Sequence, residues 1–155
     1  MAVTAQANIL NAIVLRLRTF TEITTLTSVD RIGAKIGEDW FPGPTAQPAI
    51  WLRRSGAPVD PDAWLVGVQN QRLDLWCYGA SGLAAAGLMN LALAALCPAQ
   101  GTVNRGSFKQ ALTGGTSVIV YNIVPETGVI DGTDPETGYA YSWCPLMVQF
   151  QAVAV

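Results

Sequence analysis

The sequence predicts an α+β fold in which an antiparallel β-sheet of about four strands is flanked by two helices. Three patterns lead to this prediction. Apolar residues recur at helical spacing near the N-terminus, apolar and polar residues alternate over residues 71–78, and residues 82–96 are almost uniformly Ala and Leu. Because 155 residues is the length of one ordinary domain, we expect residues 1–155 to form a single domain.

The first predicted element is an amphipathic helix over residues 5–21, and we expect Thr4 to be its N-cap. Its apolar residues are separated by four, four and three positions and form one stripe: Ile9, Ile13, Leu17 and Phe20.

Residues 22–48 are rich in Thr, Gly and Pro. Three prolines lack a backbone donor and disfavour helix in the residue before each of them: Pro42, Pro44 and Pro48. We expect a long ordered connector, which can serve as a contact surface, a lid or a tether.

Two strands follow and are expected to pair as a hairpin. Ala49–Arg54 is short and ends in Ser-Gly-Ala-Pro, and residues 60–62 carry further turn residues. In Gln71–Tyr78, Leu73, Leu75 and Cys77 alternate with polar and aromatic residues. This alternation predicts a strand with two unlike faces.

Residues 82–96 form the second predicted helix, and Ser81 can cap it. The segment contains no charged residue and is interrupted only by Gly87 and Asn90. A helix that is apolar all round belongs in a core or an interface. Its strictly apolar part is shorter than the roughly twenty residues that a membrane span requires, so we expect no membrane contact.

The C-terminal part reads as strands and turns. Residues 101–112 and 117–124 have high β-propensity, with Gly114-Gly115 between them. Residues 125–138 are acidic, rich in turn residues and internally repeated, which indicates a loop or the tip of an extended hairpin. Alternation over residues 139–155 predicts a final long strand.

The composition favours burial against partners. Half of the residues are apolar and 13% are charged, against a typical charged share of about 25%. An unusually well-packed, Ala-rich monomer is the alternative, since scattered apolar residues are normal on protein surfaces.

Charge is divided unevenly along the chain. All nine basic residues lie before residue 110, and with seven acidic residues this part of the chain has a net charge of +2. The residues that follow contain four acidic residues and no basic one, which gives a net charge of −4. Such asymmetry suits head-to-tail electrostatic matching between subunits. The candidate partner contacts are therefore Glu126, Asp131, Asp134, Glu136, Arg53 and Arg54. The alternative is that these acids only solvate a loop.

The residue inventory predicts no catalytic, cofactor-binding or metal-binding residues. The chain has no histidine, and therefore lacks the commonest general base and metal ligand. The pairs Asp60/Asp62 and Asp131/Asp134 have the oxygen ligands that a divalent cation prefers, but both lie in turn sequence where Asp usually bonds the backbone.

Three cysteines are widely spaced in apolar surroundings: Cys77, Cys97 and Cys144. We expect buried free thiols in a reducing compartment. The N-terminus lacks the features of a secretory signal, which predicts a protein made and retained in the cytoplasm.

The run Arg72-Leu-Asp-Leu-Trp-Cys-Tyr-Gly79, followed by a helix with Ala84, Leu88, Leu91 and Leu96, resembles the tail terminator (tail completion) proteins of long-tailed bacteriophages. Arg31-Ile32 and Pro48-Ala49-Ile50 extend the resemblance, which covers most of the chain. It implies an α+β protomer of a homo-oligomeric, hexameric ring that caps the tail tube and docks it to the head-side connector.

The resemblance implies a structural virion protein, and not an enzyme. Its expected partners are further copies of itself, the tail tube protein and the connector or stopper protein, with DNA passing only through the ring lumen. The acidic insert at 125–138 is longer than this family suggests, and as a hypothesis it reaches a neighbouring ring. Two alternatives remain: another neck protein, such as a head-completion or stopper ring, and an unrelated enzyme or small-molecule binding domain.

Overall fold

The computed structural model describes residues 2–35, 48–54, 69–97, 108–112, 116–135 and 138–154. Within them lie a 3-10 turn and three α-helices: Val29–Arg31, α1 (Ala2–Arg18), α2 (Thr21–Thr24) and α4 (Gly82–Leu96). Seven strands occur in the same residues: β1 (Ile32–Lys35), β2 (Ala49–Arg54), β3 (Gln69–Gly79), β4 (Phe108–Ala111), β5 (Thr116–Pro125), β6 (Ile130–Thr133) and β7 (Ala140–Ala154).

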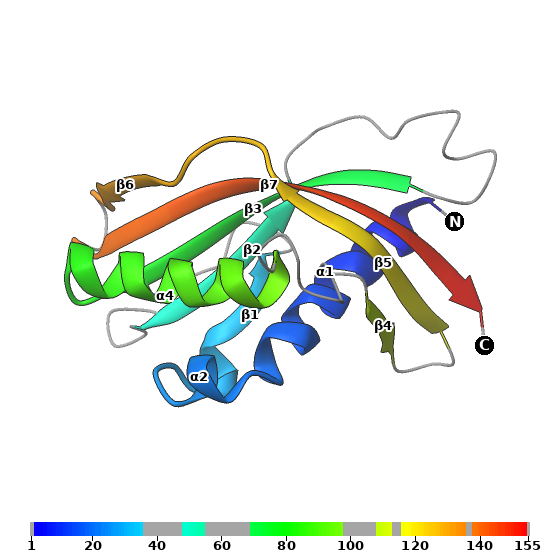
Figure 1. Ribbon diagram of the computed structural model, residues 1–155, viewed down its shortest axis with the longest axis horizontal. Helices are drawn as coiled ribbons and strands as arrows, with labels where there is room; N and C mark the ends of the chain where they lie inside the picture. The colour runs from blue at the N-terminus through cyan, green and yellow to red at the C-terminus, as the bar shows by residue number, and fades with distance from the viewer. Residues whose placement is uncertain are drawn as a thin grey trace.

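The described strands form one sheet in the order β1-β2-β3-β7-β5-β4, and β6 pairs with the N-terminal part of β7. Figure 1 shows that this sheet curls into a half-barrel around the helices. β1 runs parallel to β2, whereas the other pairs are antiparallel, so the sheet is mixed.

The predicted sheet of about four antiparallel strands flanked by two helices is therefore wrong, because the described chain is mostly β. The two strands that were not predicted, β1 and β6, lie within the expected connector at 22–48 and the turn-rich segment at 125–138. Each has only four residues, too few for a periodic pattern. Pairing with a neighbouring strand, and not local propensity, makes them strands.

Tertiary contacts hold the first of these strands in place. The guanidinium of Arg18, at the end of α1, donates two hydrogen bonds to the carbonyl oxygen of Ile32, at 3.2 and 2.7 Å. The Thr27 hydroxyl donates to the carbonyl oxygen of Pro48 at 2.5 Å, next to β2. The segment expected as a connector thus contributes α2, the 3-10 turn and β1, while residues 36–47 lie outside the described residues.

Other predicted elements are confirmed. β2 and α4 have the predicted bounds, and β2 pairs with β3 as the expected hairpin arms. The Ser81 hydroxyl caps α4 by accepting a hydrogen bond from the Ala84 backbone N–H at 3.2 Å. The first helix begins at Ala2, so Thr4 lies inside it and is not its N-cap.

Each of the three segments that the sequence predicts as C-terminal strands contains a strand. β5 and β7 match residues 117–124 and 139–155 closely, whereas β4 covers only the end of 101–112, of which residues 101–107 lie outside the described part. β6 pairs with the start of β7 inside residues 125–138 and their neighbours, where the sequence predicts a loop or the tip of an extended hairpin and no strand.

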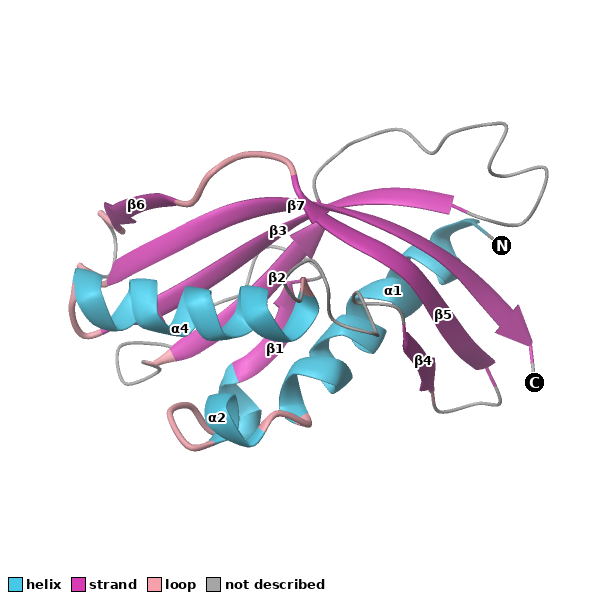
Figure 2. Cartoon of the chain, viewed as in Figure 1, coloured by secondary structure: helices cyan, strands magenta, loops and turns pink. Residues whose placement is uncertain are grey.

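The two long helices lie on one side of the sheet, which we call the inner face (Figure 2). Alternate residues of β3 and β7 point to this side and are fully buried in the core with α1 and α4: Leu73, Leu75, Cys77, Cys144, Leu146, Val148 and Phe150. The intervening residues project from the opposite side, the outer face, which neither long helix covers.

Candidate functional site

Aromatic side chains gather on the outer face of the sheet. The strand register places Trp51 of β2 opposite Trp76 of β3, and Trp76 opposite Trp143 of β7. One row further along, Tyr78 lies opposite Tyr141. These residues are far apart in sequence, and cross-strand pairing joins them into one aromatic cluster.

The rings are in direct contact. The centroids of Trp76 and Trp143 are 5.7 Å apart with nearly parallel planes, and those of Trp76 and Tyr141 are 5.0 Å apart and tilted by 58°. Both arrangements are favourable for aromatic pairs. Because Trp51, Trp76, Tyr141 and Trp143 are only partly buried, the cluster presents a fixed aromatic surface to the outside.

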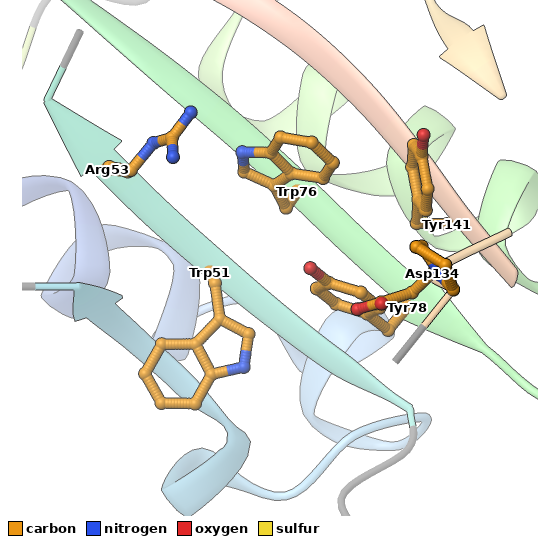
Figure 3. Close-up of a pocket in the computed structure, with 7 residues that line it drawn as sticks. Trp51, Arg53, Trp76, Tyr78, Asp134 and Tyr141 are labelled. Atoms are coloured by element: carbon orange, nitrogen blue, oxygen red, sulfur yellow. The ribbon is translucent and has the colours of Figure 1, made fainter. Parts of the chain in front are cut away.

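A pocket of about 230 Å³ opens on this cluster. Figure 3 shows Arg53 and Trp51 projecting from β2, Trp76 and Tyr78 from β3, and Tyr141 from β7, with Asp134 beside Tyr78. Among the described residues, its lining consists of Trp51, Arg53, Trp76, Tyr78, Asp134, Pro135 and Tyr141. The walls that these residues form are largely aromatic, with one cation and one carboxylate among them.

The position of Arg53 is held by two contacts. Its Nη2 forms an ion pair with Oδ2 of Asp74 at 3.2 Å, and its guanidinium lies over the Trp76 ring at 5.9 Å from the centroid. The Asp74 side chain is 6% exposed, so the pair compensates a nearly buried carboxylate.

Tyr78 is buried beneath the turn that follows β6. Burial raises the pKa of its phenol, and the neighbouring Asp134 and Tyr141 raise that pKa further, whereas Arg53 lowers it. The phenol therefore remains protonated at neutral pH and keeps its hydrogen-bond donor.

Two glycines on neighbouring strands leave room for the side chains of Trp51 and Tyr141. A Cβ on Gly33 of β1 would approach the Trp51 ring to 2.6 Å, and a Cβ on Gly132 of β6 would approach the Tyr141 hydroxyl to 2.6 Å. These two strands were absent from the prediction, so this support for the pocket was missed. The sequence signal that could have identified an aromatic outer face is the alternation of Trp76 and Tyr78 with the core residues Leu75 and Cys77.

The structure brings two of the six candidate partner contacts together, because Arg53 and Asp134 both line the pocket. Glu126 instead pairs with Arg72 of its own chain, with 2.6 Å between Oε2 and Nε. Asp131 accepts a hydrogen bond from the Ser142 hydroxyl at 2.5 Å. Glu136 and the side chain of Arg54 lie outside the described residues.

A second surface lies on α4. Ala85, Leu88, Met89, Ala92 and Leu96 are buried in the core, whereas Leu83 is 86% exposed. Its exposed neighbours are small or polar and uncharged: Gly82, Ala84, Gly87, Asn90 and Ala94. This outward face of α4 is apolar without being covered by any described part of the chain.

The cysteines are free thiols, as predicted, with Cys77 and Cys144 buried and Cys97 half-buried. Burial raises the pKa of all three and brings that of Cys97 to about 12, with a smaller contribution from Cys144 at Cys77 and Cys97. Thiols protonated at neutral pH are poor nucleophiles.

The described residues contain no group of three or more Cys, Asp or Glu side chains that could hold a metal ion. None of the described helices is long and apolar enough to cross a membrane.

In comparisons with known proteins, no family model and no curated protein matches this chain.

Proposed function

We propose that this chain is a structural virion protein of the tail terminator type. It caps the phage tail tube as a homo-oligomeric ring and joins the tail to the head-side connector. The observation that carries the proposal is the presence of two unlike, incompletely covered apolar surfaces on opposite sides of the sheet. They are the outward face of α4 and the apolar residues of the outer face.

The second of these surfaces extends along β5 and β6. Tyr121, Val124 and Ile130 are between 41% and 47% exposed. Ile130 lies opposite Trp143 of the aromatic cluster, whereas Val124 lies opposite Met147 and Tyr121 lies near Gln149, further along β7. A head-to-tail interface joins two different patches, and it produces a closed ring when the rotation between subunits closes. Two unlike apolar patches on one chain suit such an interface better than a two-fold dimer.

The proposed role in the virion is based on the resemblance of residues 72–96 to tail terminators. The aromatic residues on the outer face fit the same role, because Trp and Tyr are enriched in protein interfaces. The low charge of α4 fits as well, since charged residues are depleted from interface cores.

Sedimentation of the purified chain over a wide concentration range tests the ring, together with negative-stain images of the same samples. We expect one assembly of defined mass, hexameric by resemblance, and ring-shaped particles with a central hole. A chain that remains monomeric at every concentration would contradict the proposal.

A second experiment tests the location in the particle. An antibody against the purified chain is expected to label particles of the encoding phage where the tail joins the head, and to label isolated tails at that end. Labelling of tailless heads alone would favour a head-completion or stopper ring instead.

A further inference from the structure

Leu83 is the most exposed of the large apolar side chains among the described residues. It lies in the first turn of α4 and projects from a surface whose other exposed residues are mostly Gly and Ala. Small residues let another surface approach the helix closely. Leu83 is therefore the one large apolar side chain that protrudes from the outward face of α4, and we call it the knob.

The outer-face pocket has the complementary shape. It is lined by four aromatic side chains, and its 230 Å³ is several times the roughly 30 Å³ that one water occupies in the liquid. That volume accepts one branched aliphatic side chain. Aromatic walls provide apolar contact area for such a side chain.

Charge also matches between the two surfaces. The N-terminal end of a helix carries a partial positive charge, and the first turn of α4 contains no acidic residue of its own to compensate it. The pocket margin carries the Asp134 carboxylate. A leucine from the first turn of α4 would bring this positive end of the helix toward that carboxylate.

We propose that Leu83 of one copy inserts into the pocket formed by Trp51, Trp76, Tyr78 and Tyr141 of a second copy. This contact rests on the proposed ring and names the surfaces that build it. Because the knob and the pocket lie on opposite sides of the sheet, each copy gives one leucine and receives another. The contact therefore repeats around the ring.

Sedimentation of Leu83→Ala tests the knob. The side chain is 86% exposed within one copy, so its loss leaves the protomer folded. We expect the concentration at which half of the assembly dissociates to rise at least tenfold, the effect of removing an interface residue that matters for binding. Leu26→Ala is the matched control, because Leu26 is also exposed, at 54%, but lies on neither surface.

Disulfide trapping tests the pairing itself. Leu83→Cys protein is mixed with Pro135→Cys protein and oxidised, so that a mixed disulfide can form only between two molecules. We expect such dimers in the mixture, identified by mass. A mixture of Leu83→Cys with Gly128→Cys, whose new thiol lies on an exposed loop outside the pocket, should give none.

The outcomes separate the two proposals. If the wild-type chain forms rings, but Leu83→Ala dissociates at the wild-type concentration or the mixed disulfide fails to form, the Leu83 contact is wrong and the ring stands. If the wild-type chain is monomeric throughout, the proposed function fails and this contact fails with it.

Discussion

Gly79 and Ala85 approach so closely that a Cβ on Gly79 would lie 2.7 Å from the backbone nitrogen of Ala85. Gly79 ends β3, and Ala85 belongs to the buried side of α4. The close approach fixes how the helix leaves the strand and packs on the inner face. The obstacle is backbone, so a side chain at this position displaces the helix.

Gly79→Ala is therefore expected to destabilise the protein by about 1–3 kcal/mol, the usual cost of overpacking. Urea unfolding followed by circular dichroism measures the change. Gly128→Ala is the control, because nothing lies within 4 Å of the new methyl group, and its effect should stay within about 0.5 kcal/mol. Equal stabilities of the two variants would contradict the predicted clash.

Gly33→Ala tests the support beneath Trp51. The new methyl group would meet the edge of the indole, 2.6 Å away, and the ring can move where a backbone cannot. We expect a change in the near-ultraviolet circular dichroism of the aromatic cluster, with a smaller loss of stability than for Gly79→Ala. An unchanged spectrum would show that the ring does not rest on β1.

Ser81→Ala removes the N-cap of α4. Its hydroxyl accepts a hydrogen bond from the Ala84 N–H, and loss of such a cap typically costs about 1 kcal/mol. Ser81→Asp keeps an acceptor and should retain most of the stability. A larger loss for Ser81→Asp than for Ser81→Ala, measured by urea unfolding, would contradict the capping role.

Buried thiols make stability depend on alkaline pH. An exposed thiol ionises near pH 9, whereas burial raises the pKa of Cys77 well above that value. As pH rises above 9, the unfolded chain releases a proton that the folded chain keeps. The free energy of unfolding should therefore fall by up to about 1.4 kcal/mol per pH unit for this group.

The variant Cys77→Ala isolates this contribution. Its stability should decline less steeply above pH 9 than that of the wild type, although Cys97, Cys144 and Tyr78 still contribute in the same direction. Denaturant unfolding at a series of pH values gives both slopes. Identical slopes would show that Cys77 ionises alike in the folded and unfolded chains.

The ion pair between Arg72 and Glu126 reaches over β7 to the end of β5. Its side chains are 40% and 27% exposed, so solvent and salt screen it. A double-mutant cycle with Arg72→Met and Glu126→Gln should give a coupling of about 0.2–1 kcal/mol that decreases in high salt. A coupling that is insensitive to salt would contradict a screened pair.

Much of the local structure followed from sequence patterns because each of those elements is long enough to show its own periodicity. The bounds of β2 and α4, the alternation in β3 and the buried thiols all belong to this group. The candidate site was less accessible. Arg53 and Asp134 were selected for their charge alone, and only strand pairing places both beside the aromatic rings.

The sequence by itself determined which faces of β3 and α4 are apolar, since side-chain periodicity depends on the local backbone alone. Only the tertiary structure decided that β1 and β6 are strands, that the sheet is mixed and curled, and that both long helices share its inner face. The aromatic pocket belongs to this second group. Hydrogen bonding between segments far apart in the chain creates these features, and such pairing leaves no signal within four residues of sequence.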